Sequence, residues 1–363
     1  MNAVAETRHD PAYRAKPLGI ELTTRCNSAC THCFARAGWA EEACLAPDLA
    51  RAICAEGYRE GYRQLHLTGG EPLLWPYLMD LLDHVFTLGY QSVFLNSNGM
   101  LLTDAVARHL AQYPGLALSV SLQGPETLHD RMRGRGAYRG ACRGIAVGLE
   151  AGLRLSLFTA IGRTLLPLLP AFVADVYAKF GAIERLTLIQ MIAVKEAPLD
   201  LCRELLTPEA FLRLIRMVSA FNICGYHIHV LNNPLVNVAA ARLGLPMIPR
   251  SYPLCRPGKL MVRANGDMTL AHSTGKRFGT YTAGMIGAVL SDNRYAKAVA
   301  PDTVDCPTCR FVAHCRENGM PQPPNEALDM VGEPFYCQRA LALIDQQRGH
   351  RLRQPWDARG FQE

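Results

Sequence analysis

The feature that most constrains this chain is a regular alternation of short apolar runs with longer amphipathic runs between residues 18 and 222. The short runs are rich in β-branched or other apolar residues and end near Gly, Asn or Pro, which predicts strands. They are GIELTT, RQLHLT, QSVFLNS, GLALSVSLQ, LRLSLFTAI and ERLTLIQMI. The runs between and after them have helical periodicity and are LAPDLARAICAEGYREG, YLMDLLDHVFTLG, DAVARHLAQ, YRGACRGIAVGLEAG, LPAFVADVYAKFG and TPEAFLRLIRMVSAF. Six strand–helix units predict an α/β fold with a parallel sheet, either doubly wound or a partial barrel.

The alternation ends near residue 222, which divides the chain into five expected segments. These are an N-terminal extension (1–17), the α/β unit (18–222), an irregular bridging region (223–254), a smaller cysteine-rich domain (255–348) and a polar tail (349–363). Within the smaller domain, VRANGDMTL predicts a hairpin around Asn265–Gly266, and an apolar helix is expected near Phe335 to Asp345.

Composition narrows the classes of function. With 363 residues, about half of them hydrophobic, the chain can bury a large core. The net charge of +6 is spread among acidic residues without a basic stripe, so we expect no nucleic-acid partner. The N-terminus has no secretory signal pattern, and the longest apolar stretch, Leu165 to Ala174, contains two prolines and is too short for a membrane span. We therefore expect a soluble cytoplasmic protein whose 13 cysteines serve metal or cluster binding rather than disulfides.

Three of these cysteines form a compact motif directly after the first predicted strand. Cys26, Cys30 and Cys33 lie where a parallel sheet gathers its ligands, as do the loops LTGGEP, NSNG and SLQGP. Three thiolates can hold three irons of a cubane and leave the fourth iron open to an external ligand. A zinc site completed by His32 or a distant residue is the alternative.

Four motifs in this order make the sequence resemble the radical S-adenosylmethionine (SAM) enzymes. They are the cysteine motif, Gly69-Gly70-Glu71-Pro72, the segment NSNG and Ser121 on the fourth predicted strand. The resemblance covers residues 18–222 and implies a partial (β/α)6 TIM-like barrel. It also implies that the open iron of a [4Fe–4S] cluster binds SAM, and that one electron cleaves SAM to a 5′-deoxyadenosyl radical.

By position, the resemblance assigns contacts with SAM. Gly69, Gly70 and Glu71 are expected to receive the methionine amino group, and Ser121 and Arg133 the ribose and carboxylate. His32 stands where relatives have an aromatic residue near the adenine, Asn98 is expected near the ribose, and Gln190 near the adenine or substrate. The plainer alternatives are a tight turn at Gly69–Glu71, an Asn-Gly turn at Asn98, a strand cap at Gln190 and an exposed loop histidine. Arg135 competes with Arg133 for its role. Gln123 departs from the family, because relatives that modify peptides often have aspartate there.

A second cysteine set resembles the SPASM extension of radical SAM enzymes. Cys306, Cys309, Cys315 and Cys337 supply four thiols, and Cys255 matches the start of the extension. Ala271 and Gly319 stand at two expected cysteine positions, so we infer one auxiliary [4Fe–4S] cluster rather than two. A structural zinc ribbon is the alternative. Cys255 has no assigned cluster, so it is a packing residue, a ligand or a hydrogen donor to a radical. His272 is a candidate base or an ordinary histidine.

These features predict a radical SAM enzyme that abstracts hydrogen from an unactivated carbon. Peptide or protein maturation is the favoured use, with tetrapyrrole modification of the heme d1 or alternative heme type, or oxidation or rearrangement of a small metabolite, as alternatives. A non-enzymatic iron–sulfur or zinc-ribbon protein is the alternative outside catalysis. The expected partners are a peptide or small-molecule substrate, a flavodoxin- or ferredoxin-type electron donor and a separate leader-peptide-binding protein.

Overall fold

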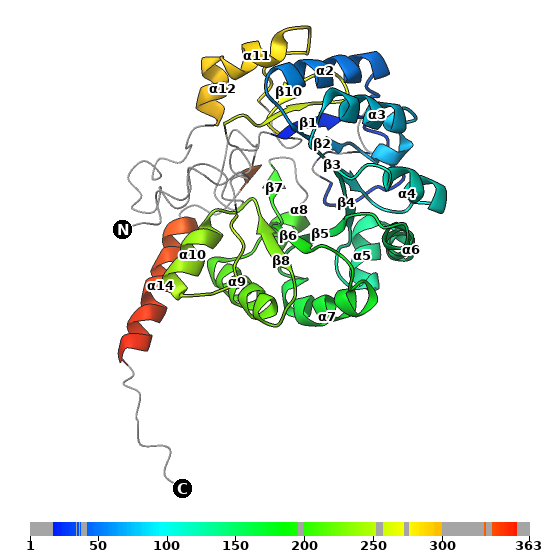
Figure 1. Ribbon diagram of the computed structural model, residues 1–363. Helices are drawn as coiled ribbons and strands as arrows, with labels where there is room; N and C mark the ends of the chain where they lie inside the picture. The colour runs from blue at the N-terminus through cyan, green and yellow to red at the C-terminus, as the bar shows by residue number, and fades with distance from the viewer. Residues whose placement is uncertain are drawn as a thin grey trace.

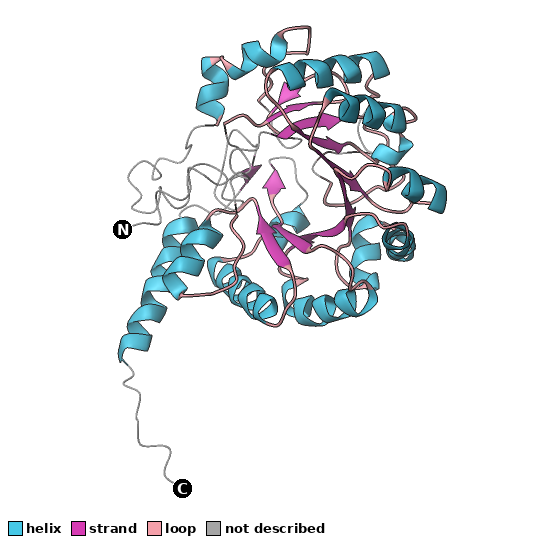
Figure 2. Cartoon of the chain, in the orientation of Figure 1, coloured by secondary structure: helices cyan, strands magenta, loops and turns pink. Residues whose placement is uncertain are grey.

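The computed structural model describes residues 17–33, 35, 37, 42–194, 199–251, 257–271, 276–299, 330–331 and 336–353. All six strands expected between residues 18 and 222 are present, and each pairs in parallel with its neighbour in sequence. They are β1 (Pro17–Glu21), β2 (Gln64–Thr68), β3 (Ser92–Ser97), β4 (Leu116–Ser121), β5 (Leu155–Ile161) and β6 (Leu186–Gln190). Figure 1 and Figure 2 show these strands curving into an open arc with helices on its outer side. The prediction of a partial α/β barrel is confirmed.

The helices that follow these strands begin and end at residues suited to those positions. Thr103 and Thr207 cap helices by accepting hydrogen bonds from Val106 N and Ala210 N, and Gly89 ends a helix with φ +97°. The helical elements of this part are α2 (Pro47–Arg59), η2 (Pro72–Leu74), α3 (Leu78–Leu88), α4 (Asp104–Leu110), α5 (Glu126–Arg133), α6 (Ala137–Glu150), η3 (Leu166–Leu168), α7 (Leu169–Lys179), α8 (Leu199–Glu204) and α9 (Pro208–Ile223).

Residues beyond 222 extend the same sheet at both edges. The region expected to be irregular contains β8 (Ile228–Leu231), which pairs in parallel with β6, and α10 (Leu235–Leu243). At the opposite edge β9 (Leu260–Val262) pairs in parallel with β1. The expected hairpin is present, because β9 turns at Gly266 into antiparallel β10 (Met268–Thr269). The remaining elements are β7 (Ala193–Val194), α11 (Met285–Leu290), α12 (Asn293–Ala298), β11 (Met330–Val331), which pairs with β7, and α14 (Tyr336–Arg353).

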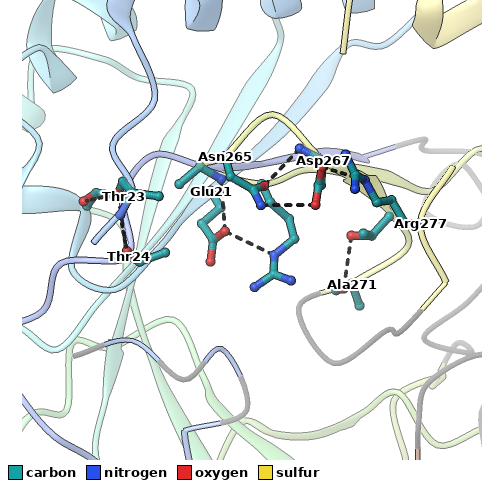
Figure 3. A network of polar contacts seen from close by, with 11 residues as sticks. Glu21, Thr23, Thr24, Asn265, Asp267, Ala271 and Arg277 are labelled. Atoms are coloured by element: carbon teal, nitrogen blue, oxygen red, sulfur yellow. Dashed lines mark hydrogen bonds and ion pairs between the residues drawn. The ribbon is translucent and has the colours of Figure 1, made fainter. Parts of the chain in front are cut away.

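Polar contacts hold the β9–β10 hairpin against β1. Glu21, the last residue of β1 and 1% exposed, accepts hydrogen bonds from Ala264 N at 3.0 Å and from Arg263 Nε at 3.4 Å. In the hairpin, Asp267 forms an ion pair with Arg277 at 2.7 Å. Figure 3 shows Glu21 and Asp267 within this network. A chain segment far from β1 in sequence therefore braces the strand that leads to the first cysteine motif.

The two faces of the sheet differ in polarity, as strand alternation requires. Facing the helices are fully buried apolar residues such as Leu67, Leu95 and Leu118. The inner face carries polar and half-buried side chains instead, among them His66 on β2, Asn96 on β3 and Phe158 on β5. The barrel interior is therefore partly open and polar, whereas the layer between strands and helices is a packed core.

The C-terminal helix α14 packs on α9 and α10. Arg242 on α10 is paired with Asp345 on α14, and Arg216 on α9 with Gln347. Among the helices that the structure describes, none combines the length and hydrophobicity needed to cross a membrane.

Candidate functional site

The candidate site lies at the carboxyl end of the barrel strands, where the loops after β1, β2 and β3 meet. Gly70 N donates to Thr23 O at 2.6 Å and Glu71 N donates to Arg25 O at 2.8 Å, so the loop after β2 is bound directly to the chain leading into the cysteine motif. Asn98 Nδ2 donates to Asn27 Oδ1 at 2.6 Å, and this bond connects the loop after β3 to the cysteine motif. Backbone and side-chain bonds thus join three loops into one unit.

Gly69 and Gly70 allow this close approach of two backbones. A Cβ atom on Gly69 would lie 2.5 Å from Thr23 O, and one on Gly70 would lie 2.1 Å from Arg25 O. No side chain can occupy either position without moving the cysteine loop. The two glycines are therefore needed to place the loop itself, a role that is separate from their predicted contact with SAM.

Glu71 is fully buried, and its carboxylate links two loops. It accepts hydrogen bonds from Leu73 N at 3.1 Å, Ser97 Oγ at 2.8 Å and Asn98 N at 2.7 Å. Burial raises the pKa of Glu71, and the bonds from Asn98, Leu73 and Ser97 oppose that shift. Because a carboxylate offers about four lone-pair sites, most of its capacity is used inside the protein.

The three cysteines of the first motif are free thiols that influence one another electrostatically. Burial raises the pKa of Cys26 to about 11, and the nearby Glu71, Cys30 and Cys33 contribute to this increase. Burial also raises the pKa of Cys30, while the positive charge of Arg133 lowers it. Clustered thiols of this kind become thiolate ligands when a metal centre supplies positive charge.

The arrangement differs from that of a mononuclear metal site. Within the described part of the chain, no three Cys, His, Asp or Glu side chains are placed to hold one metal ion. In a cubane each thiolate binds a different iron, so the three sulfurs do not have to meet at one atom. The donor set is compatible with the expected [4Fe–4S] cluster, and the zinc site stays the alternative.

Arg133, the last residue of α5, brings a guanidinium group to the cysteine motif. It influences the pKa of Cys30, Glu71 and His32, whereas its competitor Arg135 is exposed. Its Nε atom is buried and has no hydrogen-bond partner in the described part of the chain. The end of α5 is fixed here because Thr31 N donates to Met132 O at 2.9 Å. A buried guanidinium with an unused donor suits a carboxylate ligand.

Two neutral histidines lie beside Arg133. Burial lowers the pKa of His32 to about 3, and the charge of Arg133 contributes. Burial and the charge of Arg133 also lower the pKa of His129, on α5, to about 3. His129 Nδ1 accepts a hydrogen bond from Gln123 N at 3.0 Å. His32 Nδ1 is buried without a partner among the described residues, so it remains available to a ligand.

The other predicted cofactor contacts fall into two groups. Asn98 is in the site, and half-buried Ser121 ends β4 on the inner face of the barrel. Gln190 ends β6, where it accepts a hydrogen bond from Asn233 Nδ2 and lies beside Tyr336 of α14, and its predicted contact with the adenine or substrate stays a prediction. Gln123, at the position of the missing aspartate, accepts from Ala160 N at 2.7 Å and joins the ends of β4 and β5.

The second cysteine set is mostly outside the described residues. Cys306, Cys309 and Cys315 fall there, as do Cys255 and His272, so their predicted roles stay predictions. Cys337 is half-buried in the first turn of α14. Its neighbour Tyr336 lies beside Gln190 at the carboxyl end of β6. Cys337 is therefore near the same end of the barrel as the first motif.

Sequence reasoning missed the residues that join the loops. Asn27, Thr31 and the carbonyl groups of Thr23 and Arg25 carry no recognisable motif, because three of these contacts use the backbone. Asn27 could have been noticed as an amide within the cysteine motif.

Comparison with known proteins agrees with this geometry. Residues 20–167 match the model of the radical SAM superfamily. Over 122 residues the chain is 31% identical to the mycofactocin maturase MftC of Mycobacterium tuberculosis (strain ATCC 25618 / H37Rv), covering 33% of this chain and 31% of MftC. Over 132 residues it is 31% identical to the AdoMet-dependent heme synthase of Oleidesulfovibrio alaskensis, covering 35% and 33%. The chain thus spans about a third of the length of these relatives.

Solved structures show the same fold over a larger part of the chain. Native anSMEcpe with bound AdoMet superposes with a TM-score of 0.72 at 15% identity, covering 93% of this chain and 98% of that one. Streptococcus suis SuiB bound to S-adenosylmethionine gives a TM-score of 0.67 at 15% identity, covering 88% and 77%. Residues 20–167, which contain the cysteine motif, therefore carry a radical SAM superfamily domain, and the solved structures show the same barrel fold over a larger part of the chain.

Proposed function

We propose that this protein binds a [4Fe–4S] cluster through Cys26, Cys30 and Cys33 and uses it to cleave SAM reductively. The observation that carries the proposal is the unpartnered, buried Nε of Arg133 close to Cys30 and Glu71. When bound and reduced, the cluster would supply the electron that cleaves SAM to methionine and a 5′-deoxyadenosyl radical, and this radical would take a hydrogen atom from an unactivated carbon and become 5′-deoxyadenosine.

The chain's own residues have distinct tasks in this proposal. Arg133 binds the carboxylate of SAM, and its positive charge favours the thiolate of Cys30. Glu71 holds the loops after β2 and β3 in register, so that Asn98 and the Gly69–Gly70 backbone face the cofactor. His32 stays neutral near the adenine because its pKa is low.

For the substrate we propose a peptide or protein side chain. The support is the 31% identity with MftC, a maturase, over 122 residues of the barrel. A tetrapyrrole is the second candidate, because the heme synthase is equally similar over 132 residues. Cys306, Cys309, Cys315 and Cys337 are proposed to hold one auxiliary [4Fe–4S] cluster, with Cys255 and His272 as candidates for substrate chemistry nearby.

A flavodoxin- or ferredoxin-type donor would reduce the cluster, and a separate protein would present a leader peptide. A cytoplasmic location is in keeping with the free thiols of the described cysteines.

The test is anaerobic reconstitution followed by two measurements. Addition of SAM should change the electron paramagnetic resonance spectrum of the reduced cluster, and dithionite should then yield 5′-deoxyadenosine. Cys142→Ala, a substitution on α6 outside the motif, is the matched control for Cys30→Ala. The proposal fails if reconstituted wild-type protein binds iron but neither changes its spectrum with SAM nor cleaves it.

A further inference from the structure

Two polar residues inside the barrel, below the loops of the candidate site, are incompletely hydrogen-bonded. Asn96 on β3 and Ser119 on β4 are direct register partners on the inner face. Each lies two positions before a residue of the site, Asn98 and Ser121, and so projects one layer deeper into the barrel. Asn96 Nδ2 lies 2.8 Å from His66 Nε2 on β2, which holds the amide in place.

The other polar atoms of this pair have no partner among the described residues. Asn96 Oδ1 and Ser119 Oγ are both buried without a hydrogen bond, and Ser119 is 1% exposed. Buried polar atoms are nearly always hydrogen-bonded, so two neighbouring exceptions point to a group that binds there.

The strands from β3 to β6, which include the two that carry the pair, have no formally charged side chain. No residue of β3, β4, β5 or β6 is Asp, Glu, Lys or Arg. Half-buried Phe94 and Phe158 lie on the same inner face. Polar atoms that converge among apolar side chains are typical of a site that binds a small molecule or a side chain.

We propose that Asn96 and Ser119 bind an uncharged amide group of the substrate inside the barrel. An amide offers an N–H to Asn96 Oδ1 and a carbonyl oxygen to the Ser119 hydroxyl, so it satisfies both unpartnered atoms. It matches either orientation of the Asn96 side chain, because an amide supplies a donor and an acceptor together. This inference rests on the proposed function and makes its substrate class more specific.

A carboxylate fits the same position poorly. A carboxylate would lose its hydration beside strands that carry no Lys or Arg to pair with it. It also has no N–H to donate to Asn96 Oδ1. The pair therefore favours a peptide, with its backbone and side-chain amides, over a carboxylated tetrapyrrole.

The test uses two probes that differ only in the group concerned. Binding of propionamide and of propionate, which has a carboxylate in place of the amide, to anaerobically reconstituted protein is measured by saturation-transfer NMR, with and without saturating SAM. We expect the amide to bind about tenfold more tightly than the acid, and Ser119→Ala to weaken the amide about fivefold to tenfold. Ser156→Ala, the same substitution at the register partner of Ser119 on β5, is the matched control and should leave amide binding unchanged.

Several results would overturn the inference. They are absence of amide binding to the wild type, equal binding of amide and acid, equal effects of Ser119→Ala and Ser156→Ala, or loss of amide binding when SAM is added. The last result would mean that the pair belongs to the cofactor. The formation of 5′-deoxyadenosine by the wild type is measured in the same samples, so failure of the proposed function is seen separately from failure of the amide site.

Discussion

Glu71 accepts a 2.8 Å hydrogen bond from Ser97, and through it the loop after β2 is fixed to the end of β3. The same carboxylate accepts from Asn98 N, whose side chain reaches Asn27 in the cysteine motif. One buried acid thereby connects the three loops that carry the cluster ligands and the predicted SAM contacts. The shape of the site therefore depends on hydrogen bonds within the protein.

Glu71→Gln should destabilise the fold as well as the site. One carboxylate oxygen becomes an NH2 group, which faces a backbone or hydroxyl donor and leaves it unsatisfied. We expect a loss of about 1–3 kcal/mol in the free energy of unfolding, measured by urea denaturation of the metal-free protein. Glu126→Gln, which removes an exposed ion pair with Arg139, should cost less than about 1 kcal/mol and is the control. Equal losses in both variants would contradict the linking role of Glu71.

Arg133→Lys should weaken SAM binding while keeping the positive charge. Lysine lacks the planar fork that bonds a carboxylate in two places, so we expect affinity to fall about tenfold to a hundredfold. Equilibrium binding of SAM to reconstituted protein measures this. Arg135→Lys should bind SAM as the wild type does, because Arg135 is exposed. The assignment would be reversed if Arg135→Lys were the weaker binder.

Gly70→Ala should displace the cysteine loop. The added Cβ would stand 2.1 Å from Arg25 O, which is a backbone atom and cannot rotate away. We expect a loss of stability above about 2 kcal/mol and reduced iron uptake at the first motif. Gly181→Ala, where the nearest atom is 3.3 Å away, is the control and should retain its iron. Normal iron content in Gly70→Ala would show that the loop can adjust.

Acid should destabilise the protein through His129. Its pKa in the folded state is about 3, below the ordinary value of 6.5, so the unfolded state binds the extra proton between these values. Stability from this group is present above pH 6.5 and is lost as pH falls toward 3, at about 1.4 kcal/mol per pH unit. Urea denaturation at pH 7.5, 6.0 and 5.0 measures the slope. His129→Gln should lower the slope by about 1.4 kcal/mol per pH unit while the similarly depressed His32 keeps its own share, and an unchanged slope would exclude His129 as a source.

Iron content should separate the two cysteine sets. Reconstituted wild type is expected to hold about eight irons per chain, and Cys30→Ala about four. Cys30→Ala should abolish 5′-deoxyadenosine formation, whereas Cys309→Ala and Cys337→Ala should retain part of it. About four irons and one zinc in the wild type would replace the auxiliary cluster with a zinc ribbon.

The strand–helix alternation was enough to predict a parallel α/β sheet and the edge at which its ligands lie, and the resemblance to radical SAM enzymes added that the sheet forms a partial barrel. Buried apolar runs such as those of β2 and β4 give a clear local signal, and the glycines and cysteines of the site lie in motifs. β8 was missed because it has only four residues, although the alternation of His227 and His229 around Ile228 was a usable sign of it.

Other parts of the site depend on contacts that no local pattern encodes. Arg133 could be separated from Arg135 only after α5 was seen to end at Arg133. The unsatisfied pair Asn96–Ser119 follows from the register between β3 and β4, and Gln190 lies beside Asn233 and Tyr336 because segments distant in sequence pack there. Register and long-range packing are properties of the whole sheet, so single motifs do not reveal them.

The pairing of β9 with β1 has a consequence for biosynthesis. When the cysteine loop leaves the ribosome, neither of the two strands that pair with β1 has been made. β2 follows soon, whereas β9 is synthesised much later. At ordinary translation rates this leaves β1 as an open edge in the nascent polypeptide for a period on the order of tens of seconds. That edge lies directly before the cysteine motif, so the segment that carries the cluster ligands adjoins an unpaired strand until β9 has been made.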